Sequence, residues 1–85
     1  MAELRILPRQ ETVAQRVRRL QAEAKQIARE HSADLASAMA DLCMLASEIS
    51  VGGDAYPPGV REVARSLAED LENRGLTLVA IINRT

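Results

Sequence analysis

Residues 9–50 contain neither glycine nor proline, the two residues that most often interrupt regular secondary structure. Strands are enriched in aromatic and β-branched residues, yet this chain has no Phe or Trp, and Tyr56 is its only aromatic residue. Its apolar residues are mainly Ala and Leu, which favour helices. The sequence therefore predicts an all-α fold with one long helix over about residues 10–50.

One line of residues in this stretch recurs at the helical period. Its ten steps from residue 13 to residue 49 average 3.6 residues, and only one member is polar. A coiled-coil seam would run at 3.5, so strong supercoiling is not expected. We call this line the apolar stripe. It consists of Val13, Val17, Leu20, Ala24, Ile27, His31, Leu35, Ala38, Leu42, Leu45 and Ile49.

The ends of the first helix carry capping signals. Thr12 and Gln15 have the spacing of a capping box, although Pro8 also suits a first helical position. Gly52 is placed to end the helix in the left-handed conformation. The alternative is a chain broken near Ser32, which would then cap a new helix and give a three-helix bundle.

A second helix is predicted over residues 58–83, because Pro58 suits its first position and apolar residues continue at helical spacing. In the alternative, Gly75 ends this helix and residues 76–82 form a strand. The chain is expected to be one domain, residues 1–85. It would have an N-terminal arm at 1–8 and an inter-helix loop at 51–58.

The loop concentrates three of the four glycines and two of the three prolines, within the stretch VGGDAYPPGV. A phosphate-binding loop would follow a strand and end in Gly-Lys, and this loop does neither. We interpret it as a turn between helices. Tyr56 is its one candidate for docking a partner, because an exposed aromatic residue makes a good anchor.

The two helices differ in length, which predicts self-association. The first would measure roughly 60 Å and the second roughly 38 Å at the α-helical rise. Folded back, the second helix would reach only Lys25–Ile27 and leave the start of the stripe uncovered. A second apolar line, Ala36, Met39, Cys43 and Ala46, makes the face too wide for one partner helix.

We therefore expect an antiparallel helical hairpin that a homodimer completes as a four-helix bundle. A partner other than a second copy would be the alternative cover for the exposed end. The expected dimer interface consists of Val13, Val17, Leu20, Ala24, Ile27, Met39 and Cys43.

Little in the sequence points to chemistry. Eleven basic and twelve acidic residues nearly cancel, and no spacing of His31 and Cys43 matches a metal site. His31, Ser32 and Asp34 would diverge around a helix and could not form a catalytic triad. No enzyme activity, cofactor, metal, membrane span or small-molecule substrate is expected. The single cysteine fits a reducing compartment, and we expect the cytoplasm.

The expected function is therefore that of a small protein-binding adaptor or regulator that acts as a self-associating helical bundle. The alternative is a nucleic-acid-binding or transcription accessory factor that uses the basic N-terminal half of the first helix. Its candidate phosphate contacts are Arg9, Arg16 and Arg19.

Overall fold

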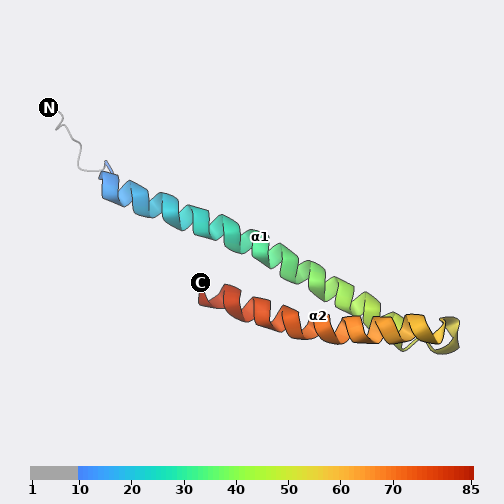
Figure 1. The fold of residues 1–85 in the computed structure, drawn as a ribbon. Helices are drawn as coiled ribbons and strands as arrows, with labels where there is room; N and C mark the ends of the chain where they lie inside the picture. The colour runs from blue at the N-terminus through green and yellow to red at the C-terminus, as the bar shows by residue number, and fades with distance from the viewer. Residues whose placement is uncertain (1–9) are drawn as a thin grey trace.

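The computed structural model describes residues 10–85 as an antiparallel hairpin of two helices (Figure 1). Helix α1 spans Val13–Ser50, a short 3₁₀ turn η1 spans Gly53–Ala55, and helix α2 spans Pro58–Arg84. The predicted all-α hairpin is confirmed. Neither alternative occurs in the described part of the chain, because α1 is continuous through Ser32 and residues 76–82 are helical.

The N-terminus of α1 is fixed by the predicted capping box. The Gln15 amide donates to Thr12 Oγ1 at 3.1 Å, and the Thr12 amide donates to Gln15 Oε1 at 2.8 Å. Both bonds satisfy amides that a helix terminus otherwise leaves without partners. Within the helix, Ser32 Oγ donates to the Ala28 carbonyl at 2.8 Å, so this serine caps no new helix.

The turn differs from the prediction by one residue. Gly53, with φ of 63°, takes the left-handed conformation that we expected at Gly52, whose φ is −78°. Gly52 has another role, because a Cβ at this position would collide with the ring of Tyr56. The two adjacent glycines are therefore required for different reasons. Gly53 adopts a positive φ, and Gly52 leaves room for the ring of Tyr56. Pro58 is the first residue of α2, as predicted.

The two helices meet along a seam whose most buried residues are small. On each helix, and apart from Ile49, the buried and half-buried residues recur in alternating steps of 3 and 4, the heptad pattern of a coiled coil. Among residues 10–85, only Ala46, Ala64 and Ala68 are buried. The seam consists of Arg29, Ser32, Ala36, Met39, Cys43, Ala46 and Ser50 on α1, and Arg61, Ala64, Ala68, Leu71, Gly75, Leu78 and Ile82 on α2.

The apolar stripe is not the line that α2 covers, which corrects the sequence analysis. The seam of α1 instead uses the second apolar line, one residue further along, and its mean step is 3.5 and not 3.6. Alanines on both helices allow the backbones to approach closely. Cys43 Sγ even donates to the Ala68 carbonyl, at 3.4 Å. The larger side chains of the stripe are left on one side of the hairpin.

Gly75 lies in this seam with open space around it, which generates a stability prediction. A Cβ added there would have no atom of α1 within 4 Å and would meet only its own chain neighbours and helix backbone, and the residue is helical. Gly75→Ala should therefore stabilise the protein by about 0.5–1 kcal/mol, because alanine loses less backbone entropy on folding. Thermal unfolding should show a midpoint raised by roughly 2–8 °C.

The matched control is Gly53→Ala, where the positive φ makes the same change unfavourable. If Gly75→Ala lowered the midpoint as Gly53→Ala does, the open space in the seam would be disproved.

Candidate interaction surface

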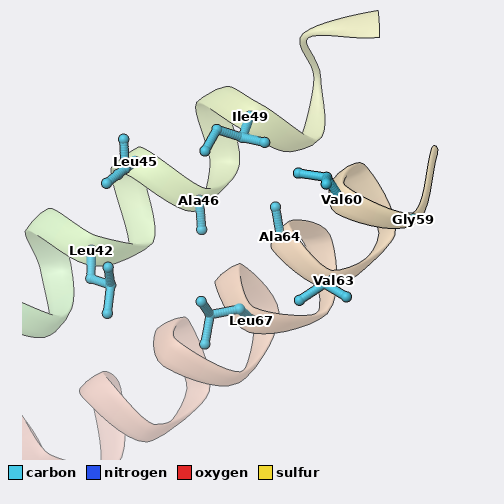
Figure 2. A pocket seen from close by; sticks show the side chains of 9 residues that line it. All are labelled: Leu42, Leu45, Ala46, Ile49, Gly59, Val60, Val63, Ala64 and Leu67. Atoms are coloured by element: carbon cyan, nitrogen blue, oxygen red, sulfur yellow. The ribbon is translucent and has the colours of Figure 1, made fainter. Parts of the chain in front are cut away.

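An apolar groove runs between the two helices at the loop end of the hairpin. Its volume is about 410 Å³, and every side chain that lines it is apolar. Figure 2 shows Ala46 and Ala64 between the helices, with larger side chains on either side of them. The lining residues are Leu42, Leu45, Ala46 and Ile49 of α1, and Gly59, Val60, Val63, Ala64 and Leu67 of α2.

The groove follows from the position of the seam. On each helix, the residue that precedes a seam residue lies on the same flank of the hairpin, since antiparallel helices share their flanks in this way. On α1, from Ser32 onward, these preceding residues are the second half of the apolar stripe. On α2 the three nearest the loop are Val60, Val63 and Leu67, and Asp70, Arg74, Thr77 and Ile81 follow them. Leu45 is 54% exposed and Val63 is 68% exposed.

The first half of the stripe lies on the part of α1 that extends beyond α2. The C-terminal end of α2 reaches the level of Lys25 and Arg29, where Ile82 and Thr85 line a surface depression with them. Residues 13–24 of α1 therefore have no covering helix, as the predicted lengths require (Figure 1). We call this segment, with Ile27, the overhang.

Five predicted interface residues occupy the overhang, and all are exposed. Val13 is 81% exposed and Ile27 is 67% exposed, which is uncommon for large apolar side chains in a contiguous line. The five are Val13, Val17, Leu20, Ala24 and Ile27.

The other two predicted interface residues, Met39 and Cys43, lie elsewhere. Both are half-buried in the seam against α2. The predicted interface did not include the exposed side chains that line the groove, such as Leu42 and Leu67. The sequence did contain an indication of this arrangement. Ala64 and Ala68 on α2 are small residues, and they can pack closely against the second apolar line of α1, which also has small residues.

Tyr56, the predicted docking residue, is half-buried at the tip of the hairpin with its ring against Gly52. Its carbonyl accepts a hydrogen bond from Arg61 Nε at 3.2 Å. Part of its ring therefore holds the turn, and the exposed remainder is what a partner could contact.

The candidate phosphate contacts are not a free basic patch. Arg9 lies outside the described residues, and Arg16 and Arg19 are exposed. Arg19 Nε and Nη2 donate to Glu11 at 2.8 and 2.9 Å, and its Nη1 donates to Glu23 at 3.0 Å. These carboxylates raise the pKa of Arg19 and reduce the positive charge that it offers to a ligand.

The same contacts stabilise the charged form of Glu11. Its pKa lies below the ordinary value of 4.5, chiefly because of the hydrogen bonds from Arg19, with a smaller contribution from the charge of Arg16. The N-terminal turn of α1 thus combines a capping box with an ion pair that joins it to the following turns.

The opposite flank of α2 is charged. Arg65 pairs with Glu62 and Glu69, which raises the pKa of Arg65. The Asp70–Arg74 pair, at 2.9 Å, lies instead on the groove flank further from the loop, because both residues directly precede seam residues. The three residues around Arg65 each directly follow a seam residue, so they lie on the flank away from the groove. They are Glu62, Arg65 and Glu69. The hairpin therefore has one apolar flank and one charged flank near the loop.

Residues 10–85 bring few chemically reactive side chains together. His31 is exposed on a continuous helix, and the neighbouring Ser32 hydroxyl is engaged with a backbone carbonyl. No group of three His, Cys, Asp or Glu side chains in these residues comes together in a way that could hold a metal ion. Within the same range, neither helix has the length and apolarity needed to cross a membrane.

Neither the protein-family models, nor the curated proteins, nor the solved structures contain a match to this chain.

The capping box generates a prediction for the overhang. Thr12→Ala should cost about 1 kcal/mol in helix stability, because it leaves the Gln15 amide without its acceptor. Hydrogen exchange should accelerate at the amides of residues 13–20, whereas Thr12→Ser should retain the slow exchange. Equal exchange in both variants would show that the cap does not hold this end.

The Glu11–Arg19 ion pair generates a pH prediction. A carboxyl whose pKa is depressed by folding stabilises the folded form above its unfolded pKa, and this contribution is lost as pH falls through the folded pKa. Exchange at residues 13–20, corrected for intrinsic rates, should therefore increase as pH is lowered below about 4.5. In Glu11→Gln this increase should shrink, and an unchanged increase would exclude the pair as its source.

Proposed function

We propose that this chain is a small non-enzymatic protein that self-associates through its apolar flank and works by binding another protein, as an adaptor or regulator. The observation that supports this most strongly is the mismatch between its core and its surface. In the described part of the chain the buried core is three alanines, while most of the apolar stripe and the groove remain exposed.

The energetics favour self-association over a stable monomer. Covering a leucine or valine side chain completely contributes roughly 1.5–3 kcal/mol relative to leaving it exposed, and an alanine offers only a methyl group. Leu20, Leu35 and Leu45 each keep about half of their surface exposed in the hairpin. Residues 10–85 form no other buried cluster, so a second copy would supply the burial that a two-helix hairpin lacks.

The surface left for a protein partner would be the charged flank and the hairpin tip. Tyr56 is the docking residue that we propose at this tip, because it is the chain's only aromatic side chain and is partly exposed. The unpaired thiol of Cys43 is compatible with a reducing compartment, and we propose the cytoplasm as the site of action. No observation favours the nucleic-acid alternative, since Arg19 is already paired with two carboxylates.

The test is the double variant Val17→Glu, Leu20→Glu. Light scattering should show a dimer for the natural chain and a monomer of 9.3 kDa for the variant, because two carboxylates would be buried without partners. Circular dichroism should also show reduced helix content in the variant.

The matched control is Ala22→Glu, on the same turns of α1 but on the opposite face from Leu20. It should remain a dimer. A natural chain that is a folded monomer at all concentrations would overturn the proposal, and so would a dimer that persists unchanged in the double variant.

A further inference from the structure

The spacing of the apolar stripe is symmetric about His31. From Val13 to His31 the steps are 4, 3, 4, 3 and 4, and from His31 to Ile49 the same steps occur in reverse. Each member therefore has a mirror member such that the two residue numbers add to 62. The pairs are Val13 with Ile49, Val17 with Leu45, Leu20 with Leu42, Ala24 with Ala38 and Ile27 with Leu35, and His31 is its own mirror.

This symmetry specifies one alignment of two antiparallel copies. In a regular heptad pattern, sliding one helix by seven residues restores the match, so many registers compete. The two consecutive steps of 4 at residues 27–31–35 occur only once in the stripe. Because this interruption shifts the phase of the apolar line, both copies stay in phase only when their interruptions coincide.

We infer that two copies pack α1 against α1 in antiparallel orientation, about a two-fold axis that passes between their His31 side chains. This inference rests on the proposed self-association and adds its register. The interface is isologous, so each contact between a residue and its mirror occurs twice.

The overhang and the groove fit each other in this arrangement. Residues 13–27 of one copy lie along residues 35–49 of the other, and each segment is about 21 Å long. Val17 and Leu20 of one copy then meet Leu45 and Leu42, the side chains that line the groove beside α2. The site is incomplete in one chain, because the segment that fills it belongs to the second copy.

The position of α2 is compatible with this pairing. A two-fold axis perpendicular to both α1 helices leaves the two α2 helices on the same side of the pair. Each α2 covers residues 29–50 of its own α1, so the two α2 helices cover opposite halves of the pair. The assembly would have three helices in cross-section at each end and four around the axis.

The size of the contact is close to what a stable dimer needs. The stripe runs about 54 Å along α1, and a contact strip about 10 Å wide gives roughly 540 Å² per copy. Val60, Val63 and Leu67 of α2 add the second wall of the groove. Specific interfaces bury roughly 800 Å² per partner, which this combined surface approaches.

The experiment measures distances between the same residue in the two copies. Single cysteines are introduced at Ala22, Ala33, Ala40 and Ser47 in a Cys43→Ser background, which retains a donor to the Ala68 carbonyl. All four positions are exposed on α1. A nitroxide label is then attached to the introduced cysteine of the full chain. Pulsed electron–electron double resonance measures the distance between the two labels of a dimer, and circular dichroism checks that each variant folds.

The expected axial separations grow with distance from residue 31, by about 3 Å per residue. They are about 6 Å at residue 33, about 27 Å at both 22 and 40, and about 48 Å at 47, before the lateral distance between labels is added. Equal distances at 22 and 40 are the signature of an axis at His31. Each of the four labelled variants also serves as a control for the folding of the other three.

The failures of the two proposals are distinguishable. Equal distances at all four positions would indicate a parallel dimer and overturn the inference alone. A register shifted by seven residues would make the distances at 22 and 40 differ by about 21 Å, which would also overturn it alone. A chain that remains monomeric and gives no dipolar coupling would overturn both the inference and the proposed self-association.

Discussion

The contact between alanines in the seam is the constraint on which the rest of the structure depends. Ala46 lies against Ala64 and Ala68, and these three are the only buried residues in the described part of the chain. Because alanine allows two helices to approach closely, the seam takes the smaller of the two apolar lines on α1. The leucines beside that line then lie on one flank, where they form the groove and continue onto the overhang.

A seam of small residues is a weak core. Burial of apolar area is the main source of folding free energy, and it grows with side-chain size. The hairpin therefore leaves the large apolar side chains of the stripe mostly exposed. The ion pairs of Arg19 and Arg65 join neighbouring turns of one segment, either α1 with the preceding Glu11 or α2 alone. Charges that are paired within a helix add little cohesion between helices. The proposed dimer is the step that would convert the exposed stripe into core.

The sequence was sufficient to predict the helices but not the face by which they meet. The ends of the helices depend on residues close to them in the sequence. These are the stretch free of glycine and proline, the Thr12–Gln15 capping box and Pro58. The choice between two adjacent apolar lines depends on the partner helix, and their periods of 3.6 and 3.5 are nearly the same. The choice between Gly52 and Gly53 likewise depends on a non-local contact, because the Tyr56 ring occupies the space beside Gly52.

In the proposed dimer, the one polar residue of the stripe, His31, also favours a single register. An imidazole in an apolar interface costs free energy unless it finds a polar partner. With the axis at His31, both imidazoles fall in one layer, where each faces the other, and every other layer is apolar. Any other antiparallel register would place each imidazole opposite an apolar side chain or beyond the stripe, in two separate layers. A polar residue at the axis therefore favours one register and disfavours the others, as a buried asparagine does in coiled coils.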